Sequence, residues 1–145
     1  MPDTTRGIVD LLSQAFEGAT EKRAVVEEVG GYIGENQPGS AAFVFGKNFG
    51  TLLGVLQTLN ARIELVKPQV WQKALGLGTS GRTRARAGAS QEDRAAVKAF
   101  NARAKAEWKR KLKEKAEQLY PALTVTLKTA DCLLLLEYAR LTSKP

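Results

Sequence analysis

Two short β-branched or alternating runs, separated by a long helical pattern, constrain the fold of this 145-residue chain more than any other feature. The first run, residues 24–29, stops at a pair of glycines, and the second, residues 61–66, alternates apolar and polar side chains. Between them, residues 41–59 are long and apolar enough for a helix, and Pro68 can begin another. This alternation predicts an α/β fold, in which ligands commonly meet the carboxyl ends of strands. Glu27 lies at such an end.

Most of the remaining chain has a helical pattern. Apolar residues at helical spacing predict one helix over 7–19, with Thr5 as its N-cap, and another over 130–141. A third, basic helix is predicted over 92–120. Its apolar stripe consists of Phe100, Ala104, Trp108, Leu112, Ala116 and Leu119. Residues 76–91 are small, polar and basic without periodicity, which predicts a mobile basic loop.

Several small or aromatic residues are predicted to lie in the core. Glycine recurs at every fourth position of one predicted helix, at Gly46, Gly50 and Gly54. This stripe predicts close packing of the helix on that side. Trp71 and Trp108 have apolar neighbours at helical spacing, which favours burial over base stacking. Cys132 is expected to be a small core residue.

Length and composition predict one domain over residues 1–145, because 43% of the residues are hydrophobic, enough for one core. The single cysteine, Cys132, excludes an intramolecular disulfide framework, and the N-terminal residues do not form a signal peptide. These features predict a cytoplasmic protein. The longest apolar run, residues 133–136, is far shorter than the ~20 residues of a membrane span, so no membrane partner is expected.

The positive charge is concentrated in the second half of the chain. Residues 67–115 contain fourteen Lys or Arg and four acids, a net charge of +10, whereas the whole chain carries +7. Such a segment predicts a polyanionic partner, because Lys and Arg gain affinity for nucleic acid by releasing counterions from phosphates. An anionic membrane surface is the weaker alternative.

The chain contains no histidine. This excludes the Ser-His-Asp triad and the histidine-ligated zinc sites of many hydrolases. Any phosphodiester hydrolysis by this chain must therefore use carboxylates and hard metal ions.

Four segments occur in a familiar order: Val25-Val26-Glu27-Glu28-Val29, Phe45-Gly46-Lys47-Asn48-Phe49-Gly50, residues 67–76 (KPQVWQKALG) and residues 128–136 (KTADCLLLL). Together they resemble RuvC-like Holliday-junction resolvases, particularly phage-type members. The resemblance runs from about residue 24 to residue 140. It implies a ribonuclease H-like fold and cleavage of branched or four-way DNA by a homodimer.

The resemblance also implies roles for individual residues. Glu27 matches the family's strand-end glutamate and Asp131 its final-helix aspartate, so both would be catalytic ligands of Mg²⁺ or Mn²⁺. Tyr32 follows the catalytic strand, where family members present an aromatic to the junction, and Lys73 lies in a DNA-facing region. Together with the basic segment, these matches give the predicted DNA contacts: Tyr32, Lys47, Lys73, Arg82, Arg84, Arg86, Lys105, Lys109 and Lys113.

The chain departs from the family pattern in two places. The family begins with a strand that carries an aspartate ligand, and nothing before Glu27 has the pattern of that strand, so the ribonuclease H-like domain is expected to be incomplete at its N-terminus. A second family carboxylate lies about one turn before the final aspartate, where this chain has Leu127 and Lys128. A protonated lysine cannot ligate Mg²⁺.

Each candidate residue also has a plain structural interpretation. Glu27 can be a solvated strand-end acid, Asp131 a helix-opening acid that complements the dipole, and the basic helix a solvated face. The alternatives to a branched-DNA nuclease are a catalytically inactive DNA-binding module and a basic scaffold for RNA. The first differs from the nuclease in metal-dependent cleavage, and the second in its preference for duplex RNA over four-way DNA.

Overall fold

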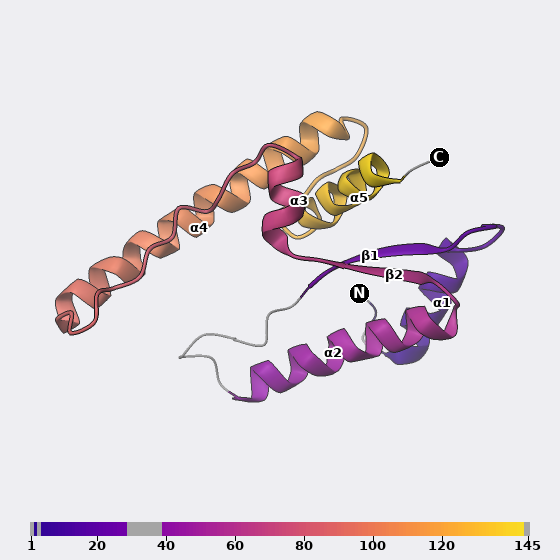
Figure 1. The fold of residues 1–145 in the computed structure, drawn as a ribbon, viewed down its shortest axis with the longest axis horizontal. Coiled ribbons are helices and arrows are strands. Elements are labelled where there is room, and N and C mark those ends of the chain that lie inside the picture. The colour runs from indigo at the N-terminus through magenta and orange to yellow at the C-terminus, as the bar shows by residue number, and fades with distance from the viewer. Residues whose placement is uncertain (1, 3, 29–38, 144–145) are drawn as a thin grey trace. The chain divides into compact units, whose positions relative to one another are not determined.

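The computed structural model describes residues 2, 4–28 and 39–143 of the chain (Figure 1). The chain divides into two compact units, Met1–Lys67 and Pro68–Pro145, and each is described by itself. The described residues form five helices and two strands. The predicted mixture of helices and strands is therefore confirmed, with helix predominating over a small parallel sheet.

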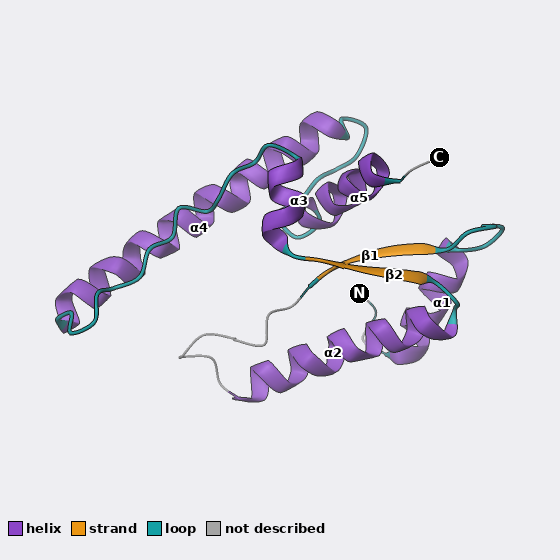
Figure 2. Ribbon diagram, viewed as in Figure 1, coloured by secondary structure: helices purple, strands orange, loops and turns teal. Residues whose placement is uncertain are grey.

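The first unit contains a strand–helix–strand sequence. Strands β1 (Arg23–Glu27) and β2 (Arg62–Val66) pair in parallel, with Glu27 opposite Val66 at their carboxyl ends. Helix α2 (Gly39–Thr58) lies between them in the sequence and contacts β2. Both strands form where their residue patterns predict them, within two residues at each end. Figure 2 shows the two strands side by side.

Helix α1 (Thr5–Ala15) packs on α2 and buries Ile8. Its N-cap is Thr4, whose hydroxyl accepts a hydrogen bond from the Gly7 backbone N–H at 3.1 Å, so the assignment of the cap to Thr5 is wrong by one residue. The helix also ends four residues before the predicted end. Gly18 adopts a left-handed φ of 71°, which turns the chain away from the helix.

The glycine stripe of α2 is not buried, which corrects the sequence prediction. Gly46, Gly50 and Gly54 are exposed, and a Cβ atom added to any of them would meet no neighbour within 4 Å. The buried residues of α2 are instead Val55 and Leu56, near its C-terminal end. Large side chains at that end supply the core contact, so the glycines are not needed for a close approach.

The second unit is helical throughout its regular structure. Helix α5 (Ala130–Thr142) packs against both α3 (Pro68–Ala74) and the long helix α4 (Gln91–Leu119). Helix α4 ends within one residue of its predicted end, because Pro121 follows the C-cap residue Tyr120 and cannot continue the helix. The core of this unit consists of Trp71, Leu77, Leu112, Ala116, Val125, Ala130, Leu134 and Tyr138.

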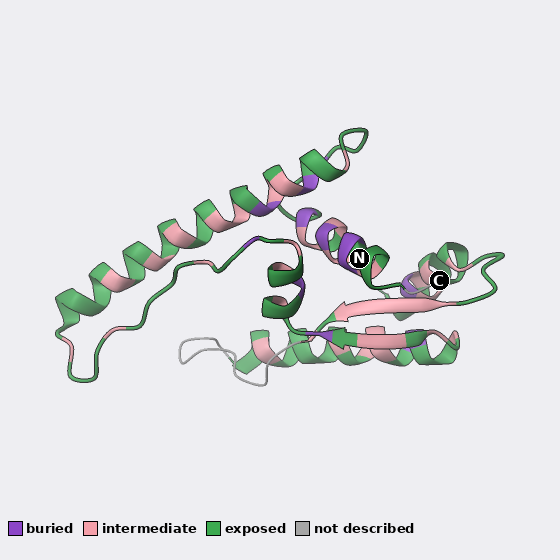
Figure 3. Ribbon diagram, turned by 45° about the horizontal axis from the view of Figure 1, so that its top comes forward, coloured by how far each residue is buried: buried purple, intermediate pink, exposed green. Residues whose placement is uncertain are grey.

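Only Leu112 and Ala116 of the predicted apolar stripe of α4 are buried, both toward its C-terminal end (Figure 3). Leu112 and Ala116 are 2% and 0% exposed, whereas Phe100 is 52% exposed. A series with a spacing of four residues drifts about 40° around a helix at each step, so Phe100 lies about 120° from Leu112. The stripe therefore cannot face one partner along its whole length.

The sequence predicts the burial of the two tryptophans correctly but not that of the cysteine. Trp71 is 1% exposed and Trp108 is half-buried, which agrees with packing roles. Cys132 is exposed, and its assignment to the core is wrong. It lies about 200° around α5 from the buried residue Ala130, on the opposite side of the helix.

A buried carboxylate joins the end of α4 to α5. Arg140 donates to Glu137 through Nη2 at 2.6 Å and Nε at 2.9 Å, and the Tyr120 hydroxyl donates to the same carboxylate at 3.2 Å. The hydrogen bonds from Arg140 hold the pKa of Glu137 below its ordinary value, against the opposing effect of burial. Glu137 therefore favours its charged form in the folded chain.

We predict that the fold loses stability in acid partly through Glu137. Because the folded-state pKa of this group is lower than its unfolded value, its contribution is present above the ordinary glutamate pKa of 4.5 and is lost as the pH falls below it. Thermal melts from pH 7 to pH 3 should show a shallower decline for Glu137→Gln than for the natural chain. Glu114→Gln, on the exposed face of α4, is the control and should leave the slope unchanged.

Candidate functional site

The first predicted ligand, Glu27, is the last residue of β1 and is exposed. The next residue continues the pairing of the strands, because the Glu28 N–H donates to the Val66 carbonyl oxygen at 2.8 Å. The structure therefore places the Glu27 carboxylate at the carboxyl end of a parallel strand pair, as the sequence predicts. Glu27 belongs to the first unit.

The second predicted ligand, Asp131, lies in the first turn of α5, in the second unit. Its Oδ2 atom forms an ion pair with Nζ of Lys109 on α4. Its Oδ1 atom is buried and has no hydrogen-bond partner among the described residues. One oxygen of this carboxylate is thus paired with a cation, and the other is buried without a partner.

Each carboxylate by itself supplies only part of a divalent-metal site. Among residues 2, 4–28 and 39–143, no three His, Cys, Asp or Glu side chains gather closely enough to hold a metal ion. Mg²⁺ is often held by one or two protein carboxylates, with water and substrate phosphate completing its ligands. Asp131 offers one oxygen suited to that role, and Lys109 puts a positive charge beside the other.

The arginine segment, residues 82–86, lies against α4 in the second unit. The Thr83 N–H donates to Oδ1 of Asn101 at 3.0 Å, and Nδ2 of Asn101 donates to the Thr83 carbonyl oxygen at 2.8 Å. Farther along α4, Nζ of Lys111 donates to the Leu77 carbonyl oxygen at 2.7 Å. Figure 2 shows this loop running along the helix. The expected lack of helix and strand over 76–91 is confirmed except at Gln91, which begins α4, and mobility stays a prediction.

The predicted DNA contacts fall into three groups. Exposed residues are Lys47 on α2, Lys73 at the end of α3, Lys105 on α4, and Arg82, Arg84 and Arg86 in the arginine segment. Two lysines of α4 are already paired with acids: Lys109 with Asp131, and Lys113 with Glu117 at 3.1 Å. Tyr32 lies outside the described residues.

Asn101 is the residue that the sequence analysis missed. It shares one face of α4 with Arg94, Lys98 and Lys105, since the four positions fall within about 60° around the helix. The spacing of these residues was visible in the sequence. The partner of Asn101 was not, because Thr83 lies eighteen positions away in a segment without periodicity.

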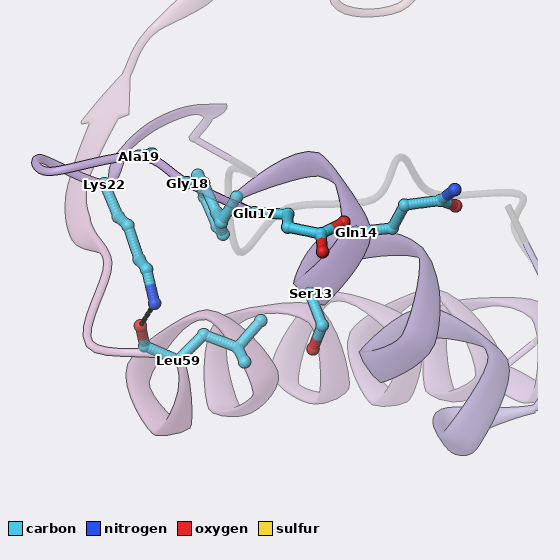
Figure 4. A pocket seen from close by; sticks show the side chains of 8 residues that line it. Ser13, Gln14, Glu17, Gly18, Ala19, Lys22 and Leu59 are labelled. Carbon is cyan, nitrogen blue, oxygen red and sulfur yellow. Dashed lines mark hydrogen bonds between the residues drawn. The ribbon is translucent and has the colours of Figure 1, made fainter.

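A separate surface hollow lies in the first unit, between the end of α1 and the end of α2 (Figure 4). Nζ of Lys22 donates across it to the Leu59 carbonyl oxygen at 3.3 Å. The residues that line it are Ser13, Gln14, Phe16, Glu17, Gly18, Ala19, Lys22 and Leu59. None of them is a predicted ligand or DNA contact.

Comparison with known proteins adds no family assignment. No protein-family model matches the chain, and no curated protein matches it in sequence. Separately, no helix that the structure describes is long and apolar enough to cross a membrane.

We predict that the Lys109–Asp131 ion pair contributes to the stability of the second unit. The two side chains are 34% and 36% exposed, so water screens their attraction, and we expect a coupling energy of about 1 kcal/mol. A double-mutant cycle with Lys109→Ala and Asp131→Ala, measured by urea unfolding, tests this. The same cycle on Arg110 and Glu114, whose charged atoms lie 3.8 Å apart in an exposed pair, should give a smaller coupling. Equal couplings would contradict the prediction.

Proposed function

We propose that this chain binds the phosphate backbone of DNA through the arginine segment and the adjoining face of α4. One observation carries the proposal: six exposed Lys or Arg side chains of the arginine segment and of the face of α4 that carries Asn101 have no ion-pair partner in the described part of the chain. They are Arg82, Arg84, Arg86, Arg94, Lys98 and Lys105. Cations that are not neutralised by neighbouring acids are the ones that gain most from contact with phosphate.

The acids nearest to this surface do not cancel it. Asp93 is engaged in the capping box at the start of α4, where its carboxylate accepts from the Ser90 N–H at 3.2 Å and the Ser90 hydroxyl at 2.8 Å. Glu92 is also in that first turn. Acids in the first turn of a helix are stabilised by the helix dipole. From position 94 to position 105 of α4, all of the charged side chains are positive.

The choice of branched DNA comes from the resemblance to RuvC-like resolvases. That resemblance also makes metal-dependent cleavage within a ribonuclease H-like domain the second candidate function. Two observations favour it: the position of Glu27 at the carboxyl end of β1 and the unpartnered Oδ1 atom of Asp131. In this proposal each of the two carboxylates is a ligand of Mg²⁺ or Mn²⁺, and the protein acts as a homodimer. The metal would activate water and stabilise the leaving oxygen.

Binding without cleavage is the rival to the nuclease. It is favoured by the ion pair between Lys109 and Asp131, because the lysine already neutralises the carboxylate that a metal would need. The rival and the nuclease share the same basic surface. Only the metal dependence of cleavage, and not that of binding, separates them.

We predict that two neighbouring lysines of α4 contribute unequally to DNA binding. Lys105→Ala should weaken the binding of a four-way junction and lower the slope of log affinity against log salt by about 0.9, the value for one lost phosphate contact. Lys109→Ala should change the slope less, because its ammonium is paired with Asp131. Fluorescence anisotropy from low to moderate salt measures both. Equal losses would show that Lys109 leaves Asp131 when DNA binds.

We predict cleavage of a labelled four-way DNA junction that depends on Mg²⁺ or Mn²⁺ and is abolished by Glu27→Gln or Asp131→Asn. Both changes remove a charged metal ligand while keeping the size of the side chain. Glu64→Gln, elsewhere on the strand pair, serves as the control. Cleavage that survives both changes would exclude these ligands. Tight junction binding without cleavage would favour the inactive DNA-binding module, and tighter binding of duplex RNA at matched salt would favour the RNA scaffold.

A further inference from the structure

Asn101 holds the arginine segment in the way that a neighbouring β-strand would. Its side-chain amide accepts from the N–H of Thr83 and donates to the carbonyl oxygen of the same residue, at 3.0 and 2.8 Å. In a β-ladder, one residue exchanges both of its backbone hydrogen bonds with its partner in the same manner. A single side chain therefore fixes both the position and the orientation of the backbone at Thr83.

The path of the chain along α4 is set at two further points. The Lys111–Leu77 hydrogen bond holds one end of the loop, and the other end leads into the Ser90 cap of α4. Lys111 and Gln91 are separated by twenty residues of helix, a length of about 30 Å. The loop therefore runs antiparallel to α4. A turn in which the Ala89 N–H donates to the Arg86 carbonyl oxygen at 3.1 Å closes the arginine segment.

The hydrogen bonds to Thr83 also set the side of the loop on which the neighbouring arginine side chains lie. Side chains alternate between the two sides of an extended chain, so Arg82, Arg84 and Arg86 share one side. The three arginines are all exposed, and of the two residues between them Ala85 is half-buried and Thr83 is exposed. Alternate residues of an extended chain lie about 6.7 Å apart, a spacing comparable to that of successive phosphates along one nucleic-acid strand.

An exposed aromatic precedes Asn101 in the sequence of α4 and lies about 100° from it around the helix. Phe100 adjoins Asn101 and is 52% exposed, because the drift of the apolar stripe takes it away from the core. Proteins that bind single strands combine a positively charged track for the backbone with aromatic side chains on which bases stack. In a duplex the bases are already stacked on one another, so Phe100 would have no accessible base face.

We infer that the arginine segment and Phe100 form a binding site for one unpaired DNA strand, with Asn101 as the positioning residue. This inference rests on the proposed DNA binding and adds the class of strand that the surface accepts. Arg82, Arg84 and Arg86 contact successive phosphates, and Phe100 stacks on a base. Branched DNA offers such a strand wherever base pairs open at the branch.

The first part of the test does not involve DNA. Hydrogen exchange followed by NMR should show faster exchange of the Thr83 amide in Asn101→Ala, because its acceptor is removed. Gln118→Ala removes an amide from an exposed position of the same helix and serves as the matched control. Unchanged exchange at Thr83 in Asn101→Ala would overturn the positioning role.

The second part measures the affinity of the full chain for a labelled oligothymidylate and for a duplex of the same length. Asn101→Ala should weaken oligothymidylate binding about fivefold, since the segment must then be ordered on binding. Replacing the three arginines together by glutamine should lower the salt slope by about 2, at about 0.7 for each contact on a single strand. Phe100→Ala should cost about tenfold on oligothymidylate and leave duplex affinity within twofold.

The outcomes separate this inference from the proposed function. If the natural chain binds neither nucleic acid, the proposed DNA binding itself fails. If it binds DNA but Asn101→Ala and the arginine replacement leave the affinity and the slope unchanged, the arginine segment is not the site. If Phe100→Ala weakens duplex and oligothymidylate equally, or neither, the preference for an unpaired strand is wrong.

Discussion

The packing of α5 against the C-terminal half of α4 is the contact on which the second unit depends. The two helices contact each other, and their most deeply buried residues are Leu112 and Ala116 on α4 and Ala130 and Leu134 on α5. Loss of volume in such a core is costly, because neighbours relax only partly into the gap. The contact occupies one end of α4 and leaves the other end to the arginine segment. The core and the proposed DNA-binding surface thus use different residues of one helix.

Much of the secondary structure could be predicted from local patterns. The two strands and α2, α4 and α5 form within about two residues of their predicted ends, and α3 begins at Pro68 as predicted, because β-branched runs and prolines act locally. Burial was predicted less well. The exposure of Gly46 and Cys132 depends on which neighbour covers each helix face, which a single periodic pattern does not specify. The ribonuclease H-like arrangement needs pairings beyond the two strands described and stays a proposal.

The candidate site could be predicted only in part, for a similar reason. The strand-end position of Glu27 and the helix-opening position of Asp131 follow from nearby residues. The pairing of Asp131 with Lys109 joins residues far apart in the sequence, as does the pairing of Thr83 with Asn101. Charge and composition identify a basic surface. They do not identify which lysines are already neutralised by an acid.

The exposed glycines of α2 imply that local stability varies along that helix. Gly46, Gly50 and Gly54 each cost up to about 1 kcal/mol relative to alanine in a helix interior, and no side-chain contact offsets this cost. Tertiary anchoring comes from Val55 and Leu56, at the end that leads to β2. Opening of α2 should therefore begin at its N-terminal end and cost less free energy than opening near the anchor. Within the first unit, the parallel strand pair and the last turns of α2 persist when the start of the helix has frayed.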